Sequence, residues 1–361
     1  MRKIYNFSAG PAILPSDVLL KIQKDFLNWK KIGLSITEIS HRHRKFIKNT
    51  EIIEQDLRDI LNIPIDYQIL FCHGGARGQF SAVPMNLLAD FPKPDYINSG
   101  FWSNNAILEA QKYCHPNVIN VKKISIFNEK YIESMKDWNL SKFSTYVHYC
   151  PNETIEGIEI FEEPKFKNKV FVGDFSSTLL SRNIDIKKYG IIYACAQKNI
   201  GPAGITIVII KKNLLNEKKN LYHRFLIILF SKKTNSMFNT PTTFSWYVAG
   251  LVFQWIKKIG GISVLEDLNK KKSKILYEYI DSTNFYENFI KKSHRSRMNI
   301  IFYLKQKLTN IFIKEAQSFG LWGLQGHSFI GGLRASIYNA MPLKGVQFLI
   351  KFMKKFEKKF G

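Results

Sequence analysis

The stretch IIYACAQKNIGPAGITIVII, residues 191–210, contains two apolar runs joined by a short polar turn. The runs at 191–194 and 205–210 have the length of strands that are buried on both faces of a sheet. Their connection is too short for a parallel crossover, so we expect the second strand to run antiparallel to the first. The turn contains Lys198 and continues into the rigid GPAG segment at 201–204, which would hold this lysine at the edge of the sheet.

Outward from this stretch, the middle of the chain repeats one pattern: a short apolar run that ends in small or polar residues. The further strands are expected at 68–72, 96–98, 118–121, 145–150 and 170–172. Helical patterns at 78–90 and 103–113 lie between some of these runs. The alternation predicts an α/β fold whose large domain has a mostly parallel sheet flanked by helices.

Helical patterns also flank this middle part, and a second strand-and-helix alternation follows it. The first flanking helix is expected to begin near residue 16 and to include Trp29 in its apolar stripe, and the others are expected at 45–61, 246–259 and 264–280. The C-terminal part alternates strands at 298–304 and 332–337 with helices at 309–319 and 344–360. We therefore expect a large domain over 16–260 and a smaller α/β domain formed by 1–15 and 261–361.

Composition excludes several classes of protein. The chain has 361 residues, 45% of them hydrophobic, and a formal net charge of +24. The charge comes from 43 scattered lysines and only 10 arginines, a bias that does not favour nucleic acid as a partner. The four cysteines are widely spaced, which predicts neither a metal site nor a disulfide framework. Without a signal peptide or an apolar run of membrane-spanning length, we expect a cytoplasmic protein with no membrane partner.

Five polar or aromatic features follow the expected strands, where α/β sheets bind their ligands. The segment GGARG at 74–78 opens a helix and could bind a phosphate or form a plain tight turn. Asp174 could cap a helix or pair with a cationic ring nitrogen, and Trp102 could belong to the core or stack on a flat cofactor. Asn239-Thr240 could cap a helix or donate to a phosphate. Together with the Lys198 amine, these features form a set suited to pyridoxal 5′-phosphate.

Eight motifs spread over nearly the whole chain resemble those of the phosphoserine aminotransferase family. They are NFSAGPA at 6–12, SHR at 40–42, FCHGGARGQF at 71–80, HYCPNET at 148–154, DFSS at 174–177, AQKNIGPAG at 196–204, MFNTP at 237–241 and GLRASIYN at 332–339. The resemblance implies the aspartate-aminotransferase-like fold type I, with pyridoxal 5′-phosphate as cofactor. It also implies a homodimer whose active sites are shared between the subunits.

The resemblance assigns roles to individual residues of this sequence. It implies that Lys198 binds the cofactor aldehyde and moves the substrate proton, while Asp174 keeps the pyridine nitrogen protonated. Trp102 would stack on the ring, and Thr154 would bond its phenolic oxygen. The cofactor phosphate would be held by Ala76, Arg77 and Gln197, joined by Asn239 and Thr240 from the partner subunit.

The two amino donors of the family reaction, glutamate and phosphoserine, each have an α-carboxylate at one end and a second anionic group at the other. The resemblance implies cationic residues for both groups. It implies amino transfer between L-glutamate and 3-phosphohydroxypyruvate in serine biosynthesis, and also to the related four-carbon oxo acid, 3-hydroxy-2-oxo-4-phosphooxybutanoate, of pyridoxine biosynthesis. Arg334 would bind the α-carboxylate. His41 and Arg42 from the other subunit would bind the distal phosphate or carboxylate, together with His327.

Two departures from the family pattern leave alternatives open. His327 is followed by Ser328, where the family usually has an arginine aimed at the substrate phosphate. The loss of one charge-assisted bond there would cost about 1 to 3 kcal/mol of affinity. The segment 221–233 is also more apolar than its family counterpart. The alternatives are another fold type I enzyme with the same cofactor, or a degraded basic binding protein.

Overall fold

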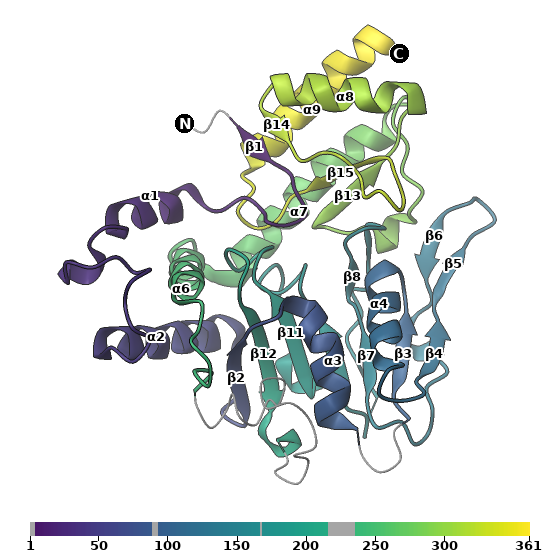
Figure 1. The fold of residues 1–361 in the computed structure, drawn as a ribbon. Helices are drawn as coiled ribbons and strands as arrows, with labels where there is room; N and C mark the ends of the chain where they lie inside the picture. Colours follow the sequence, from purple (N-terminus) through teal and green to yellow (C-terminus); the bar gives the residue numbers. More distant parts are fainter. Residues whose placement is uncertain (1–3, 89–92, 167, 216–234) are drawn as a thin grey trace.

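The computed structural model describes residues 4–88, 93–166, 168–215 and 235–361. Its largest sheet within these ranges has seven strands in the order β2-β12-β11-β10-β7-β3-β4 (Figure 1). The strands are β2 (Tyr67–Cys72), β12 (Thr206–Lys211), β11 (Ile191–Cys195), β10 (Phe171–Asp174), β7 (Val147–Tyr149), β3 (Asp95–Asn98) and β4 (Asn117–Asn120). All neighbouring pairs are parallel except those of β12, which runs antiparallel to both β11 and β2. The predicted direction of this strand is confirmed.

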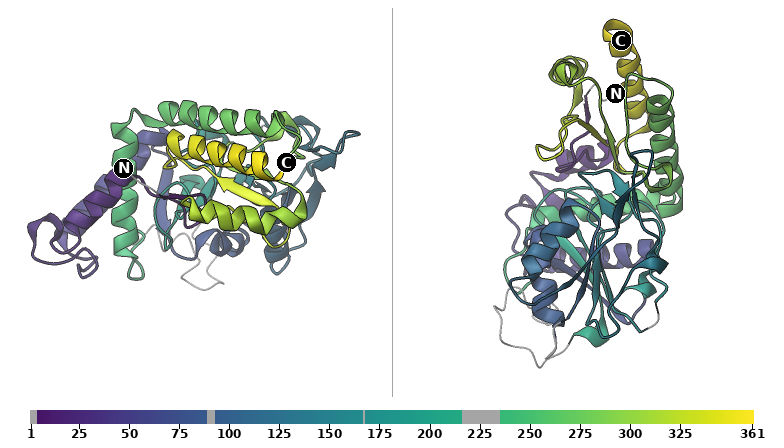
Figure 2. Two further views of the ribbon diagram at one scale, coloured as in Figure 1. Left: turned by 90° about the horizontal axis from the view of Figure 1, so that it is seen from above. Right: turned by 90° about the vertical axis from the view of Figure 1, so that its right-hand side faces the viewer.

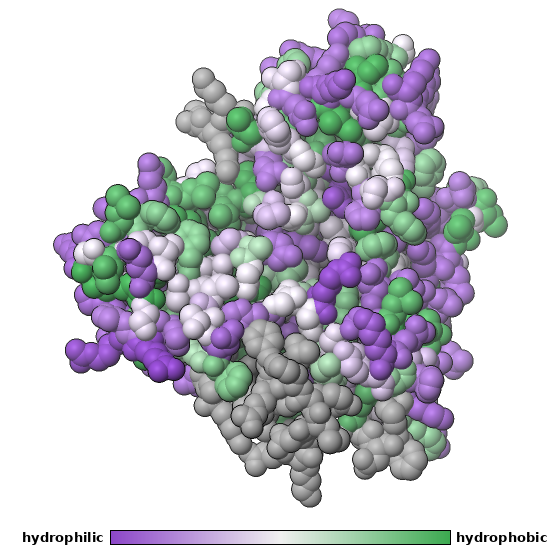
Figure 3. All heavy atoms as spheres, viewed as in Figure 1, coloured by the Kyte–Doolittle hydropathy of each residue, from purple (hydrophilic) through white to green (hydrophobic). Residues whose placement is uncertain are grey.

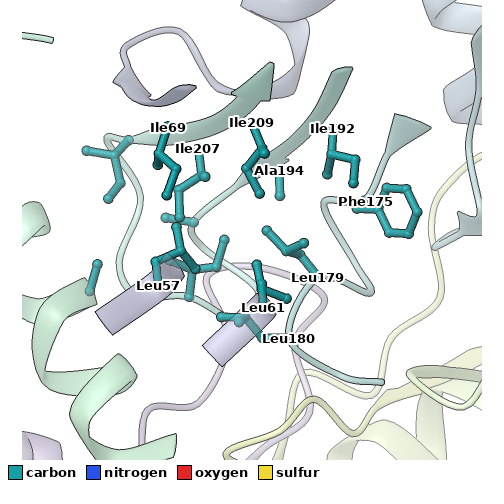
Figure 4. Packing of buried hydrophobic residues seen from close by; sticks show 14 of the residues in the cluster. Leu57, Leu61, Ile69, Phe175, Leu179, Leu180, Ile192, Ala194, Ile207 and Ile209 are labelled. Atoms are coloured by element: carbon teal, nitrogen blue, oxygen red, sulfur yellow. The ribbon is translucent and has the colours of Figure 1, made fainter. Parts of the chain in front are cut away.

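Helices cover both faces of the sheet, as the right-hand view of Figure 2 shows. On one face lie α3 (Gly75–Leu87) and α4 (Phe101–Ala110), and on the other lie α2 (Arg44–Leu61) and α6 (Thr243–Lys258). The residues of β12 alternate between these faces because successive strand side chains point in opposite directions. The core of the large sheet has a layer on each face. Ile207 and Ile209 belong to the layer beneath α2, near Leu57 and Leu61 (Figure 4), whereas Val208 belongs to the layer on the opposite face.

A second core gathers the C-terminal elements and the beginning of the chain. The helices here are α7 (Gly261–Asp281), α8 (Gln306–Ser318) and α9 (Leu343–Phe360), and the antiparallel strands are β13 (Asn299–Phe302) and β15 (Leu333–Ser336). The short strand β1 (Tyr5–Asn6) pairs with β14 (Leu321–Trp322) in parallel. Phe7 and Ile13 are buried in this core together with residues of α9 such as Phe352. The chain therefore crosses between the two cores more than once.

Several elements differ from the sequence prediction. The run at 118–121 was expected to be buried, but β4 is the edge strand of the sheet and Val118 is 37% exposed. Helix α1 (Ser16–Asp25) ends before Trp29, which is buried in a separate 3-10 turn, η1 (Trp29–Lys31). The hairpins β5–β6 (Lys122–Ile124, Lys130–Ile132) and β8–β9 (Asn152–Glu153, Ile158–Glu159) were not expected, because strands of two or three residues carry no readable period. The segment 221–233 lies outside the described residues.

Among the described residues no single helix is long and apolar enough to cross a membrane. One pair of helices, α6 and α7, has enough length and apolar character when taken together, but it is bent by 85° at the break.

A buried histidine in the central sheet gives the fold a testable response to acid. His148 lies on β7, where its Nε2 is 2.7 Å from the Tyr193 hydroxyl and its ring stacks on Tyr96. Burial lowers the pKa of His148 to about 3. Below pH 6.5 this histidine therefore binds a proton in the unfolded chain but stays neutral in the folded chain. The free energy of unfolding decreases as the pH falls towards 3.

Replacing His148 by glutamine removes this titration and keeps a polar partner for Tyr193. Between pH 6 and pH 4, urea unfolding of the natural chain is expected to lose about 1.4 kcal/mol per pH unit more than the variant. The exposed His115→Gln provides the matched control for loss of an imidazole. Equal pH slopes for the natural chain and the His148 variant would contradict the prediction.

Candidate active site

A cavity of about 220 Å³ opens at the carboxyl ends of β2, β10 and β11. Its lining comes from the loop that starts α3, from the first turn of α4, and from the segments that follow β7, β10 and β11. The lining residues are Gly74, Gly75, Ala76, Arg77, Trp102, Asn152, Thr154, Asp174, Ser176, Ser177, Cys195, Gln197 and Lys198. Seven of the cofactor residues expected from the sequence thus line one cavity, although they lie far apart along the chain.

Lys198 provides the amine of this cavity. Its Nζ donates a hydrogen bond to the Thr154 Oγ1 at 2.8 Å and lies 5.8 Å from the centre of the Trp102 ring. Burial disfavours its charged form, but nearby acidic groups, Tyr338 foremost, outweigh that cost and raise the pKa of Lys198. In the absence of a bound ligand the amine is therefore protonated and lies over the face of the Trp102 indole.

Asp174 provides the acid at the inner end of the cavity. It is the last residue of β10, it is only 6% exposed, and it accepts a hydrogen bond from the Ser176 N–H at 3.0 Å. Burial raises its pKa despite this bond and despite the charge of Lys198. A buried carboxylate in this state is stabilised by a further cation or N–H donor, which a protonated pyridine nitrogen would supply.

The start of α3 forms a cradle for an anion. Gly74 is the N-cap residue and has a φ of 90°, a left-handed conformation that favours glycine. The turn leaves the first backbone N–H groups of the helix, those of Gly75, Ala76 and Arg77, without carbonyl partners within the helix. These donors and the helix dipole attract a phosphate, and the Arg77 guanidinium lies 5.6 Å from the Trp102 ring.

The donor set of the cavity fits pyridoxal 5′-phosphate. It has an amine for the aldehyde, a buried carboxylate for the ring nitrogen, an indole face for the ring and a helix N-terminus for the phosphate. The indole Nε1 of Trp102 and the amide oxygen of Asn152 are both buried without a hydrogen-bond partner in the described part of the chain. These polar atoms are consistent with a cavity built to receive a polar ligand.

Arg334 and His327 lie close to this cavity. Arg334 is half-buried on β15, and its positive charge is one of the influences that act on the pKa of Lys198. Its Nε is buried and has no partner among the described residues. The His327 ring lies 5.3 Å from that of Phe101, the neighbour of Trp102. Neither residue belongs to the lining of the cavity, and their expected contact with the substrate stays a prediction.

The other four expected residues also lie outside the lining of this cavity. His41 is half-buried, whereas Arg42, Asn239 and Thr240 are exposed. Exposure is what their expected contribution to a partner's site requires, and that contribution stays a prediction.

Sequence reasoning gave no role to a set of buried amides that joins the cavity wall to the second core. Asn152 donates to Ser177 Oγ at 2.8 Å and to Asn299 Oδ1 at 2.9 Å. Asn299 donates in turn to the hydroxyl of Tyr338 at 3.1 Å. Asn152 and Ser177 both lie in motifs of the family resemblance, so their importance could have been inferred from the sequence. Asn299 lies in none of these motifs.

A second link of this kind starts beside the lysine. The Asn339 N–H donates to Asn199 Oδ1 at 3.0 Å, and Asn269 on α7 donates to Asn339 Oδ1 at 2.8 Å. One turn further along α7, the buried Lys272 donates to the backbone carbonyls of Ile337, Tyr338 and Met341. The segment that follows Arg334 is thereby fixed relative to Lys198, which favours a preformed substrate site.

Comparison with known proteins agrees with this geometry. The Aminotransferase class-V family matches residues 4–349. The fold and the site thus define a class-V aminotransferase.

Relatives of known identity narrow the class. Phosphoserine aminotransferase of Buchnera aphidicola subsp. Cinara cedri (strain Cc) is 63% identical, and that of Blochmanniella floridana is 52% identical, each over 100% of both chains. The structure of phosphoserine aminotransferase from Bacillus circulans subsp. alkalophilus matches with a TM-score of 0.95 and 36% identity over 99% of both chains. The pyridoxal-phosphate-bound enzyme of Trichomonas vaginalis matches with a TM-score of 0.91 and 36% identity, over 97% of this chain and 99% of the other. The chain belongs to the phosphoserine aminotransferase family.

Proposed function

We propose that the chain transfers an amino group between L-glutamate and 3-phosphohydroxypyruvate, giving 2-oxoglutarate and O-phospho-L-serine, with pyridoxal 5′-phosphate as cofactor. The observation that carries the proposal is the convergence of Lys198, Asp174 and the N-terminus of α3 on one cavity. The names of the relatives support O-phospho-L-serine as one of the substrates. The seven expected cofactor residues that line the cavity argue against a degraded binding protein, and the family argues against a different reaction with this cofactor.

The chain's own groups would hold the cofactor at four points. The first-turn amides of α3, with Arg77 and Gln197, would hold the phosphate, and Asp174 would accept the proton of the ring nitrogen. Trp102 would cover one face of the ring, and Thr154 would bond the ring's phenolic oxygen. When bound, the cofactor supplies an aldehyde that exchanges amines and a ring that withdraws electrons from the substrate's α-carbon.

Lys198 would then act as the base of the reaction. Its Nζ is the amine that lines the cavity beside Asp174, so it can take the proton from the α-carbon of a bound substrate. Thr154 Oγ1 fixes the direction of this amine through the 2.8 Å hydrogen bond. Asp174, which stays negative beside a cationic ring, stabilises the charge that develops when the proton leaves.

Substrate selection would depend on two cationic ends of the site. Arg334 offers a planar guanidinium to the α-carboxylate. His327, together with His41 and Arg42 of a second subunit, would bind the distal anion. Ser328 leaves that end with one cation fewer than is usual in the family.

We propose that two copies of the chain pair through the region around α1. This region exposes large apolar side chains, among them Leu20, Leu27 and Leu34. Hydrophobic surface, drawn in green, gathers at the left of Figure 3, the side on which Figure 1 places α1. Exposed apolar patches of this kind favour protein contacts. We also propose the division into a large domain over 16–260 and a small domain of 1–15 and 261–361. The core that joins Phe7 and Ile13 to the C-terminal elements supports it, whereas Ile262, Leu265 and Ile290 pack in the core of the large sheet.

Two half-reactions followed separately test the proposed function. Protein loaded with pyridoxal 5′-phosphate is expected to show the visible absorbance band of the lysine-bound cofactor. Glutamate and O-phospho-L-serine, each added alone, should both remove that band and release their own oxo acid. Arg334→Gln should raise the KM for both donors about tenfold or more, because it removes a charge-assisted bond to their common carboxylate.

Each failure has its own meaning. A protein without the band would contradict cofactor binding, whereas a response to glutamate alone would contradict recognition of the phosphate. An Arg334 variant with unchanged KM values would contradict the assignment of the α-carboxylate.

A further inference from the structure

Two buried carboxylates on one loop cap the helix that carries Trp102. Glu153 is 1% exposed, and its two oxygens accept hydrogen bonds from the backbone N–H groups of Trp102 at 2.8 Å and Ser103 at 2.9 Å. Glu156 accepts from the N–H of Phe101 at 2.8 Å. The first three N–H groups of α4 are thus all bound by side chains that lie about fifty positions later in the chain.

The same loop carries a residue of the cofactor cavity. Thr154 directly follows Glu153, and its hydroxyl accepts the hydrogen bond of Lys198. Glu153 therefore joins two walls of the cavity, the indole of α4 and the hydroxyl of the loop. Bonds from N–H groups to a carboxylate at a helix N-terminus gain from the helix dipole, so this connection is stronger than a neutral hydrogen bond.

Packing leaves these carboxylates little freedom. A Cβ placed on Gly100, the residue before α4, would lie 2.7 Å from the Cγ of Glu153 and 2.8 Å from the Cδ of Glu156. The backbone of Gly100 is extended, with a φ of 172°, so any residue could adopt its conformation. The glycine is thus required by the space that the two carboxylates occupy.

The charges around the pair are few. The Nζ of Lys122 lies 3.8 Å from Glu156, and burial raises the pKa of both carboxyls, that of Glu156 to about 7. Ser99 donates to Glu153 through its hydroxyl at 3.2 Å. A pair of carboxylates is costly to bury with so little positive charge nearby, and a structural helix cap needs only one short polar side chain.

We propose that Glu153 is a positioning residue that acts through Trp102, holding the indole in the place where it covers the cofactor ring. This inference rests on the proposed cofactor. Glu156 holds the preceding turn, and Gly100 leaves room for both. Glu153 does not touch the reacting atoms, and its effect on the site passes through the backbone of α4.

A double-variant cycle in cofactor affinity tests the proposal. The quantity measured is the dissociation constant of pyridoxal 5′-phosphate for the cofactor-free protein. It is obtained from quenching of tryptophan fluorescence, and from equilibrium dialysis for the variants that lack Trp102. Glu153→Gln is expected to raise it about tenfold, since one amide N–H would face the helix N–H groups. Gly100→Ala should have a similar effect by displacing the carboxylates. Glu109→Gln, on the same helix but bonded to Ser81 and Lys112, is the matched control and should leave the constant unchanged.

The cycle separates positioning from a general loss of structure. If Glu153 acts through the indole, Glu153→Gln should add almost nothing to the effect of Trp102→Phe. Additive effects, or a lower melting temperature with an unchanged dissociation constant, would overturn the proposal.

Hydrogen exchange of the cofactor-free protein gives a readout that does not depend on the cofactor. The amides of Trp102 and Ser103 should exchange about tenfold faster in Glu153→Gln than in the natural chain. Unchanged protection would overturn the positioning role. A natural chain that binds no pyridoxal 5′-phosphate but protects these amides would instead contradict the proposed function.

Discussion

Lys198→Ala is expected to lower kcat by about 10⁴-fold or more, because the variant loses both the amine that holds the cofactor and the base that moves the substrate proton. The cavity shows why no neighbour takes over. Thr154, the hydrogen-bond partner of the lysine, has a hydroxyl that is a poor base at neutral pH. The measurement is a single-turnover assay with glutamate, in which release of 2-oxoglutarate is followed directly.

Lys198→Arg is the matched control for charge and length. It keeps a cation against Trp102, but a guanidinium stays protonated and cannot act as a base. Turnover should be lost to the same extent, while the stability of the folded chain should change little. An arginine variant with more than about a hundredth of the natural rate would contradict the role of this amine as the base.

Asp174→Asn is expected to lower kcat by about 10³-fold, because a neutral amide cannot keep the ring nitrogen charged while the substrate proton leaves. Asp174→Glu keeps the charge and should retain more activity than the asparagine variant. The measurement is kcat for the overall reaction at saturating glutamate. An asparagine variant as active as the glutamate variant would show that the charge is not needed.

The same substitution should have the opposite effect on stability without cofactor. Burial raises the pKa of Asp174, so above the ordinary pKa of an aspartate the unfolded chain loses its proton more readily than the folded chain does. Stability due to this group therefore falls as the pH rises through that window. At pH 7 cofactor-free Asp174→Asn should melt no lower than the natural chain. A clear drop in melting temperature would contradict this reading of the buried charge.

Patterns that are local in the sequence predicted the large sheet well. The antiparallel direction of β12 follows from the short turn around Lys198, and its burial on both faces follows from its continuous apolar run. Part of the cavity could be found residue by residue, because the segment 74–78, Trp102, Asp174 and Lys198 follow expected strands, whereas Thr154 and Gln197 came only from the family resemblance. Their common purpose became clear only when they were considered together.

Interactions between distant segments were beyond such reasoning. Helix α4 was expected from residue 103 but begins at Phe101, because its cap is supplied by Glu153 and Glu156 rather than by a local side chain. The contact between Asn152 and Asn299 likewise depends on how two separate cores meet. Neither the spacing of apolar residues nor the composition of the sequence predicts such a contact between distant segments.

The pairing of β1 with β14 sets the order in which the protein can be completed during its synthesis. Tyr5 and Asn6 leave the ribosome early, yet their partners Leu321 and Trp322 are made near the end of translation. Until then, apolar side chains such as Phe7 have no core to enter and are available to chaperones. The N-terminal segment also donates from Ala12 to the carbonyl of Gln197, beside the lysine. The turn that carries Lys198 thus has one of its contacts with a segment whose own strand partners are the last to be made.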